Sequence, residues 1–323
     1  MRVSLIGGGT DLPAYQKAGH TGMILSFAIP YRVSVTVSQR FDDTWVIQYS
    51  HLERVSRIAD IKHNIIREAL IYYGIDKPLE IHIISDISTV GTGLGGSSAL
   101  TCALVKAFRK YNRKSSMVRR VFQDAKSIEI DRVGAPIGIQ DLIPAAHGGL
   151  NFFTIKNGLC QKIDRLYAYR FRELVKEYFL LVSETKNAEV KPHYVEQNTI
   201  GELNLDALKE SADLASKYAD RIISPNISEK EVIELIQKSH ALKEKNKINR
   251  STKEQNFFLK KLEDCGAAAY RRCGAGNQGF YLVYVKNKAS FKKQMAGHII
   301  LDIGIESVGA QIEVRRDKVN QWN

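Results

Sequence analysis

Cysteine is scarce in this sequence, and its spacing excludes the usual zinc and disulfide frameworks. No C-x-x-C pair is present, and the four cysteines are scattered along the chain: Cys102, Cys160, Cys265 and Cys273. Zinc sites and small disulfide scaffolds both need closely spaced or paired cysteines. We therefore expect all four to be reduced residues that pack in the fold.

Long apolar runs, internal repeats and low-complexity segments are also missing. No run approaches the roughly 18–20 apolar residues that cross a bilayer, and no signal-peptide pattern opens the sequence. We therefore expect a cytoplasmic protein without a membrane partner. The 44% of hydrophobic and 25% of charged residues are ordinary for a folded chain, and 323 residues are enough for two domains.

Acidic residues are fewer than basic ones, 35 against 47, which gives a formal net charge of +12. Such an excess suits anionic small molecules and nucleic acids equally. A nucleic-acid interface usually interleaves basic with aromatic residues, but the densest basic stretch, residues 243–253, contains no aromatic residue. We therefore expect small-molecule substrates and no nucleic-acid partner, in a monomer or a homodimer.

The two common nucleotide-binding signatures are absent, although a glycine-rich segment suited to phosphate is present. Residues 91–98, GTGLGGSS, are called here the second glycine motif, and an apolar helical pattern follows them. Glycine lets backbone N–H groups approach a ligand closely, and a helix N-terminus favours an anion. No Gly-Lys-Ser/Thr follows, and the glycine spacing is not that of a dinucleotide-binding loop. We expect Ser97 or Ser98 to be the N-cap of this helix. The alternative to a phosphate loop is a flexible glycine turn before a core helix.

An earlier glycine cluster, residues 7–11 with the sequence GGGTD, is called the first glycine motif. It follows a short expected strand, and its glycines permit a tight turn that presents Thr10 and Asp11. Strand and helix patterns mix along the chain, including a helix that ends at Gly74 and long helical patterns over residues 202–222 and 230–245. An apolar strand begins near Phe179, so we expect two domains, 1–175 and 176–323, of α+β or α/β class.

A third glycine motif, GAGNQG at residues 274–279, completes a set at the beginning, middle and end of the chain. The order and contents of the three motifs resemble the GHMP kinase superfamily, and the resemblance covers nearly the whole chain. It implies an α+β, two-domain GHMP kinase fold. The N-terminal domain would be α/β and ribosomal-protein-S5-domain-2-like, with the nucleotide-phosphate loop, and the C-terminal domain would be a ferredoxin-like split βαβ unit.

Three further segments, residues 7–29, 137–153 and 239–245, are similar to one branch of this superfamily. That branch transfers phosphate from ATP to the anomeric C1 hydroxyl of D-glycero-D-manno-heptose 7-phosphate, for lipopolysaccharide, capsule or surface-layer glycans. L-fucokinase-like enzymes share several of these features and remain an alternative. A non-catalytic homologue that binds a sugar or a nucleotide is a second alternative.

The resemblance assigns catalytic and cofactor roles to particular residues. Asp141 would accept or orient the proton of the sugar hydroxyl, and Arg2 would lie near the migrating phosphate or the sugar. Mg²⁺ would bind Glu129 and either Ser97 or Ser98, since the alignment leaves the serine open. The ATP phosphates would bind the second glycine motif, through Gly91, Gly93, Leu94, Gly95, Gly96, Ser97 and Ser98. The alternatives are a solvated helix carboxylate for Glu129, a turn-capping residue for Asp141 and a surface arginine for Arg2.

The resemblance also assigns substrate-binding residues: Gly8, Gly9, Thr10, Asp11, Thr185, Lys186 and Gly276. Thr10 and Asp11 would hold sugar hydroxyls. Thr185 and Lys186 would form the pocket for the sugar's phosphate, at a place where the branch usually has an arginine. The third motif reads GAGNQGF instead of GAGGGGF, and Gly96 stands where serine is common. These departures indicate a divergent substrate or weakened catalysis.

Overall fold

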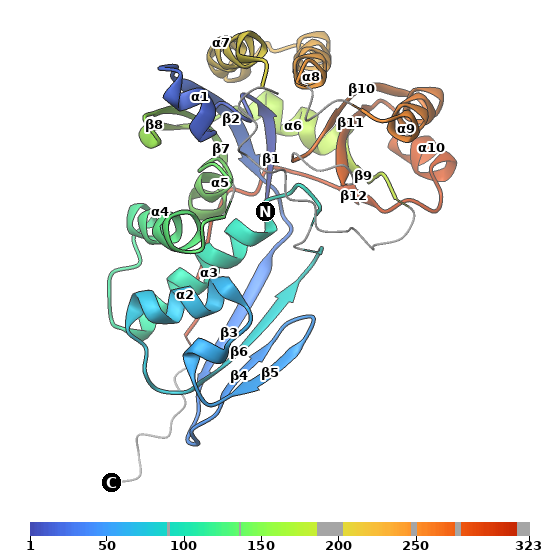
Figure 1. Cartoon of the computed structure of the whole chain (residues 1–323). Coiled ribbons are helices and arrows are strands. Elements are labelled where there is room, and N and C mark those ends of the chain that lie inside the picture. Colours follow the sequence, from blue (N-terminus) through green and yellow to red (C-terminus); the bar gives the residue numbers. More distant parts are fainter. Residues whose placement is uncertain (89–90, 136, 186–202, 247–250, 275–278, 315–323) are drawn as a thin grey trace.

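The structure is a computed structural model that describes residues 1–88, 91–135, 137–185, 203–246, 251–274 and 279–314. Its described strands form three four-stranded sheets (Figure 1). The first sheet is antiparallel and has the order β1–β2–β7–β8. Its strands are β1 (Arg2–Ile6), β2 (Gly22–Ala28), β7 (Leu150–Lys156) and β8 (Leu159–Leu166). The first glycine motif leaves the end of β1, as the sequence predicts.

The second sheet has the order β3–β6–β4–β5, with one parallel pair between β4 and β6. Its strands are β3 (Val33–Gln39), β4 (Trp45–Gln48), β5 (Leu52–Val55) and β6 (Leu79–Ser85). A group of helices lies beside this sheet in Figure 1, and α3 packs against β3. These helices are α2 (Asn64–Tyr73), α3 (Gly96–Tyr111), α4 (Val118–Lys126) and α5 (Leu142–His147), with η1 (Ile58–Asp60) before α2.

The third sheet has the order β10–β11–β9–β12, and all its pairs are antiparallel. Its strands are β9 (Phe179–Ser183), β10 (Ala267–Arg272), β11 (Phe280–Val285) and β12 (Ile300–Asp302). In chain order this is the arrangement of a ferredoxin-like unit, in which the first strand lies between the third and the fourth. The helices α9 (Lys253–Asp264) and α10 (Lys288–Gln294) accompany it (Figure 1).

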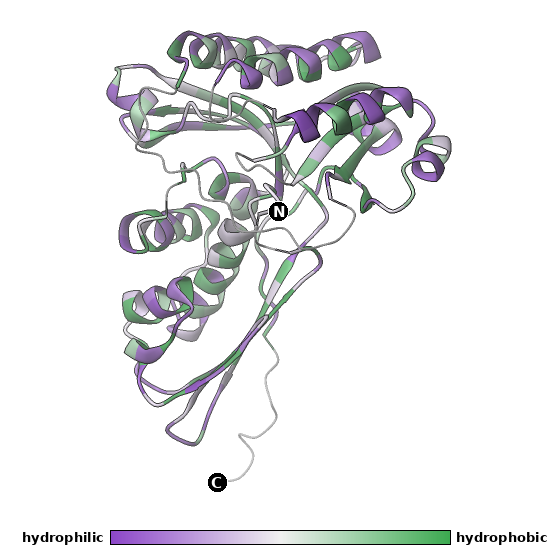
Figure 2. Cartoon of the chain, turned by 45° about the vertical axis from the view of Figure 1, so that its right-hand side comes forward, coloured by the Kyte–Doolittle hydropathy of each residue, from purple (hydrophilic) through white to green (hydrophobic). Residues whose placement is uncertain are grey.

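Two long helices pack on the first sheet, and one of them also packs on the third. α7 (Leu205–Ile222) packs on β1 and β2, and α8 (Glu229–Glu244) packs on both β1 and β10. Hydrophilic and hydrophobic stretches alternate along both ribbons in Figure 2, as expected of helices that bury one face. Ser228 and Glu231 form a capping box at the start of α8. The shorter helices α1 (Pro13–Lys17) and α6 (Tyr169–Tyr178) complete the set.

Contacts cross the predicted domain boundary at residues 175 and 176. The boundary falls inside α6, and one apolar core cluster contains buried residues of both β1 and β9. The segment after β12 returns to the N-terminal part, where the Gly149 N–H donates to the Glu306 carbonyl at 2.6 Å and the Ala310 N–H donates to the Ala145 carbonyl at 2.9 Å. The division into two domains at this position therefore stays a prediction.

Local predictions from the sequence have mixed outcomes. α2 ends at Gly74, which has the predicted left-handed conformation with φ of 60°. The predicted N-cap of α3 is wrong, because the helix begins at Gly96 and its N-cap is Gly95, with φ of 71°. α4 does not end in a regular cap, since it passes directly into a π-helical turn, η2 (Ser127–Arg132). π-helical turns occur often at functional sites.

Candidate active site

Both ends of the third glycine motif pack against the second. A Cβ atom at Gly93 would lie only 2.5 Å from the Cys273 carbonyl oxygen. At the other end, the Phe280 N–H donates to the Thr92 carbonyl at 3.3 Å. Two segments about 180 residues apart in the sequence therefore share one place in the fold, and the close approach depends on a missing side chain.

This close approach predicts a specific effect of Gly93→Ala. Gly93 has φ of 72°, so alanine is strained there, and its methyl group would also push the third motif away. We expect a loss of about 2–4 kcal/mol in the free energy of unfolding and a KM for ATP raised at least about tenfold.

Gly158→Ala is the matched control for that variant. Gly158 has a similar φ of 70°, but its Cβ would meet nothing within 4 Å. It should therefore show only the backbone strain, about 1 kcal/mol, with an unchanged KM for ATP. Equal effects of the two variants in urea unfolding and ATP kinetics would contradict the packing argument.

Asp141 and Arg2 form a buried ion pair at the end of the second glycine motif. The Arg2 Nε donates to Asp141 Oδ1 at 2.7 Å, and Arg2 Nη2 lies 2.6 Å from the same oxygen. Arg2 also donates to the Gly93 carbonyl through Nη1, and its backbone N–H donates to the Leu94 carbonyl at 2.9 Å. Asp141 occupies the N-cap position of α5 but makes no capping bond. The carboxylate is thus held beside the predicted phosphate loop by the first strand.

Asp11 joins the first glycine motif to the loop that carries Asp141. The backbone N–H of Gln140 donates to Asp11 Oδ2 at 3.1 Å, and the Gln140 side-chain amide donates to Oδ1 at 3.3 Å. A Cβ at Gly138 would overlap the Asp11 carboxylate. Burial raises the pKa of Asp11 to about 6; the Gln140 N–H opposes this shift, and the charge of Asp141 adds to it. Asp11 and Asp141 are therefore neighbours.

Thr10 has partners inside the chain. Its hydroxyl donates to the Gly7 carbonyl at 2.7 Å and accepts from the Met23 N–H at 3.2 Å, and the residue is fully buried. Its predicted contact with a sugar hydroxyl stays a prediction. The hydroxyl serves to close the turn of the first glycine motif in this structure.

Glu129 and Ser98 form a buried polar pair without hydrogen-bond partners of good geometry. Both residues are 0% exposed, and among the described residues neither the Glu129 carboxylate oxygens nor the Ser98 hydroxyl has a hydrogen-bond partner of standard geometry. Burial raises the pKa of Glu129 to about 7, against the opposing effect of the Ser97 and Ser98 hydroxyls that face it. Buried, unsatisfied oxygens are costly, and Mg²⁺ binds with few hard oxygen ligands. These residues therefore fit the predicted metal, with Glu129 on η2 and Ser98 in the first turn of α3.

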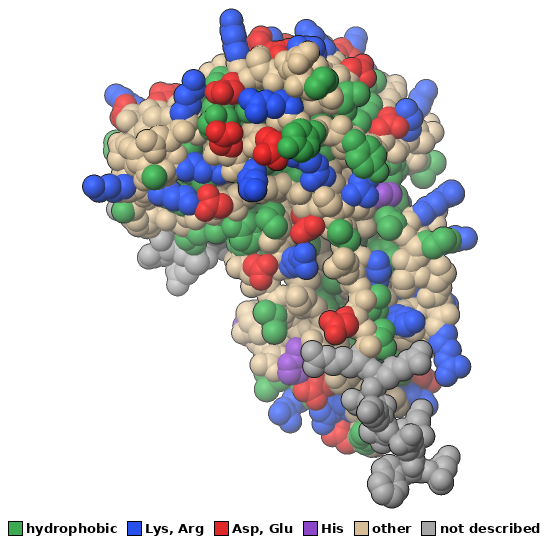
Figure 3. All heavy atoms as spheres, turned by 180° about the vertical axis from the view of Figure 1, so that it is seen from behind, with side chains coloured by type: hydrophobic (Ala, Val, Ile, Leu, Met, Phe, Trp, Pro, Cys, Tyr) green, Lys and Arg blue, Asp and Glu red, His purple; other side chains and the backbone are tan. Residues whose placement is uncertain are grey.

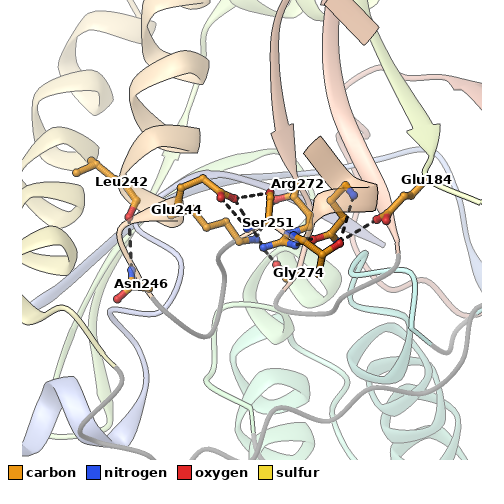
Figure 4. Close-up of polar contacts among 10 residues, drawn as sticks. Glu184, Leu242, Glu244, Asn246, Ser251, Arg272 and Gly274 are labelled. Atoms are coloured by element: carbon orange, nitrogen blue, oxygen red, sulfur yellow. Dashed lines mark hydrogen bonds and ion pairs between the residues drawn. The ribbon is translucent and has the colours of Figure 1, made fainter. Parts of the chain in front are cut away.

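Basic side chains gather where α8 and β10 meet the first glycine motif. Lys243 donates to the carbonyls of Arg272 and Gly274, the former at 3.0 Å. Arg271 is 5% exposed and donates through Nη1 to the Ser4 carbonyl of β1. Arg272 lies in a separate network with Glu244 and with the pair Gln255–Glu184 (Figure 4). Two adjacent arginines of one strand thus have different surroundings.

The outer surface does not repeat this concentration of charge. On the face seen in Figure 3, lysine and arginine side chains lie scattered among acidic ones. A nucleic-acid interface would present a continuous basic stripe. That face therefore offers no support for the nucleic-acid alternative. Within the described residues, no helix has the length and apolar character needed to cross a membrane.

The structure brings together most residues of the predicted site. The first and second glycine motifs, Arg2, Asp141 and Glu129 surround one region, linked by the contacts given above. Leu94 points into the apolar core, with 0% exposure, so its backbone faces the site instead. Thr185 follows β9 beside the third motif, since the Glu184 N–H donates to the Gly279 carbonyl at 2.9 Å. Lys186 and Gly276 lie outside the described residues.

Three residues of this region, Gln140, Lys243 and Arg271, were not predicted from the sequence. Gln140 directly precedes Asp141, so the same segment signals it. Lys243 lies in the heptose-branch-like segment 239–245, and Arg271 lies three residues before the third glycine motif. Their positions in or near these motifs marked them as candidates for the site. Only the packing of α8 on β1 and β10 shows which groups they face.

Comparisons with known proteins agree with this arrangement. Residues 58–149 match the family described as GHMP kinases N terminal domain. The chain is 26% identical over 313 residues to a D-glycero-alpha-D-manno-heptose 7-phosphate kinase of Campylobacter jejuni, covering 88% of this chain and 87% of the relative.

Solved structures share the fold. A D-glycero-D-manno-heptose 1-phosphate kinase from Bacteroides thetaiotaomicron superposes with a TM-score of 0.77 at 17% identity, over 98% of both chains. Lactococcus lactis galactokinase, complexed with galactose, gives a TM-score of 0.72 at 15% identity, over 95% of this chain and 92% of that one. The resemblance indicated by the three glycine motifs is thereby confirmed: the protein carries a GHMP kinase N-terminal domain within the GHMP kinase fold.

Proposed function

We propose that this protein is an ATP-dependent sugar kinase that phosphorylates D-glycero-D-manno-heptose 7-phosphate at the anomeric C1 hydroxyl. The enzyme class, a phosphotransferase with an alcohol group as acceptor, follows from its kinase relatives. The single observation that carries the proposal is the Arg2–Asp141 pair beside the second glycine motif, because it places a held carboxylate next to a phosphate-binding loop.

The chemistry follows from this placement. The sugar hydroxyl oxygen attacks the γ-phosphorus of ATP, the bond from that phosphorus to the bridging oxygen breaks, and ADP leaves. Asp141 takes or orients the hydroxyl proton. Arg2 has two roles: it orients the Asp141 carboxylate through a hydrogen bond, and it ties that carboxylate to Gly93 and Leu94. Glycines at positions 91, 93 and 95 all have positive φ, which lets the loop curve around phosphate oxygens.

Ser98 and Glu129 would hold Mg²⁺. Of the two candidate serines, Ser98 is fully buried with an unpartnered hydroxyl, whereas Ser97 is half-buried. When bound, the ion neutralises charge on the phosphates. Asp11 would bind hydroxyls of the sugar with the acceptor positions that Gln140 leaves free. Thr185 and Lys186 remain the sequence-based candidates for the sugar's own phosphate.

ADP release with Mg-ATP tests the proposal directly. We would assay heptose 7-phosphate, mannose 6-phosphate, L-fucose, galactose and a blank without sugar. Strong turnover with heptose 7-phosphate alone is the expected result. Turnover with an unphosphorylated sugar would keep the kinase but replace the acceptor by the L-fucokinase-like alternative. ATP binding with no turnover on any sugar would favour a non-catalytic homologue.

A further inference from the structure

Two basic residues near α8, β10 and the first glycine motif, Arg271 and Lys243, have no role in the proposed phosphoryl transfer. Arg271 and Lys243 form no ion pair with any carboxylate in the described parts of the chain, although Arg271 is 5% exposed and Lys243 is half-buried. An unpaired buried charge is strongly unfavourable unless a counterion completes it. An anion bound between these two side chains would therefore stabilise them.

The neighbouring Arg272, on the same strand, has both a hydrogen-bond partner and an acidic partner. Successive side chains of a strand point to opposite faces, and Arg272 points to the face where Gln255 accepts its Nη1 at 3.0 Å and Glu244 lies 3.9 Å from Nη2 (Figure 4). Arg271 points the other way, toward β1, where its Nη1 donates to the Ser4 carbonyl. Its Nε is buried and has no hydrogen-bond partner among the residues that the structure describes.

The free side of Arg271 faces the acceptor part of the site. A Cβ placed on Gly8 would lie 3.6 Å from Arg271 Nη2 and 3.2 Å from Gln140 Oε1. Gly8 belongs to the first glycine motif, and Gln140 directly precedes Asp141. Arg271 thus reaches the turn that we assign to the sugar.

The electrostatics around Lys243 point in the same direction. Burial lowers the pKa of Lys243 well below its ordinary value, and Arg271, Arg272 and Arg2 lower it further. A nearby carboxylate would act oppositely, so the local field is positive. A bound anion would oppose this shift and favour the ammonium form, which has three donors. The carbonyls of Arg272 and Gly274 accept two of them, so the third donor is available to the anion.

We propose that Arg271, assisted by Lys243, binds the phosphate group that the acceptor sugar already carries. This inference rests on the proposed function, because it takes the acceptor to be a sugar phosphate. It assigns the phosphate pocket to β10 and α8 in place of Thr185 and Lys186. With Nη1 on the Ser4 carbonyl, the Nε and Nη2 donors of the guanidinium are left for a ligand, and a pair of donors suits a phosphate better than a single lysine does.

A purely structural role for Arg271 must be distinguished from this one. β1 has an irregular register between Ser4 and Ile6, and the Ser239 hydroxyl already donates to the Leu5 carbonyl there at 2.7 Å. Arg271 would merely hold this bulge if it had no ligand. If Arg271 only supported the bulge, its loss would weaken the binding of every acceptor sugar alike. If Arg271 binds the phosphate, its loss would weaken the binding of phosphorylated acceptors only.

The test is calorimetric binding, without ATP, of two matched pairs of sugars to the full chain. The pairs are heptose 7-phosphate with heptose, and mannose 6-phosphate with mannose. Arg271→Gln should weaken binding of the better phosphorylated sugar roughly 10- to 100-fold, while its unphosphorylated partner changes less than about threefold. Lys243→Met should do the same to a smaller extent.

Arg272→Gln is the matched control, because it removes the same charge from the next position of the strand. It should lower the melting temperature but leave the preference for the phosphorylated sugar intact. Lys186→Met tests the competing pocket. If Lys186→Met abolishes the preference for the phosphorylated sugar and Arg271→Gln does not, the assignment is overturned. Equal binding of both sugars of each pair to the wild-type protein would also overturn it.

This experiment separates the inference from the proposed function. A wild-type protein that binds a sugar phosphate through Arg271 but releases no ADP would support the inference and contradict the kinase proposal. A protein that releases ADP with heptose 7-phosphate, yet still prefers the phosphorylated sugar after Arg271→Gln, would support the kinase proposal and contradict the inference.

Discussion

Asp141→Asn is expected to lower kcat for the sugar substrate by about 10²–10⁴-fold, because asparagine cannot take the hydroxyl proton. The side chain keeps its size, so binding of ATP should remain within about threefold of the wild type. The measurements are ADP release at saturating sugar and calorimetric titration with ATP. A variant that retained more than about a tenth of the wild-type kcat would remove Asp141 from the catalytic role.

The same substitution has a consequence for stability that needs a control. Arg2, which is 4% exposed, loses its charged partner when Asp141 becomes neutral. Some loss of melting temperature is therefore expected. Asp131→Asn is the matched control, since it neutralises an exposed carboxylate that pairs with Lys126 at 3.0 Å. It should change neither kcat nor the melting temperature appreciably.

Glu129→Gln is expected to abolish most of the activity and yet to stabilise the protein in the absence of divalent cations. Burial raises the pKa of Glu129 from 4.5 to about 7 in the folded state. The folded state therefore binds this proton more tightly than the unfolded state does, and stability falls as the pH rises through about 4.5 to 7. At pH 8 the ionised carboxylate should cost about 3 kcal/mol, which the neutral glutamine avoids.

Mg²⁺ should change the melting temperature of the wild type but not that of this variant. In the wild type at pH 8, added Mg²⁺ should raise the melting temperature, because it binds the folded state only. Glu129→Gln should melt higher without Mg²⁺ and respond little to it. Glu234→Gln, which removes an exposed carboxylate paired with Lys238 at 2.6 Å, is the matched control. Lower stability of Glu129→Gln at pH 8 without Mg²⁺ would show that the carboxylate is not an uncompensated buried charge.

Much of the site could be predicted from the sequence because its parts are local. Turns rich in glycine, an acid after a glycine motif and a helix that follows a loop are visible in short stretches. Asp141, Arg2 and the second glycine motif indeed lie together, although the roles proposed for them await the experiments above. The N-cap of α3 was mispredicted because Gly95 adopts positive φ, where a Cβ would lie 3.1 Å from Arg2 Cγ. That constraint comes from a residue 93 positions away.

The strand, helix and turn patterns were enough to predict a mixed α and β protein, because each depends on a few neighbouring residues. The GHMP kinase fold was predicted from the resemblance of the three glycine motifs to that superfamily. The tertiary structure alone decided which buried charges are paired. Arg271 and Arg272 are adjacent and chemically identical, yet β10 sends one to Glu244 and the other to β1. Glu129 likewise differs from an ordinary helix carboxylate only because α3 and η2 bury it. Burial and pairing are long-range properties, and local sequence patterns do not encode them.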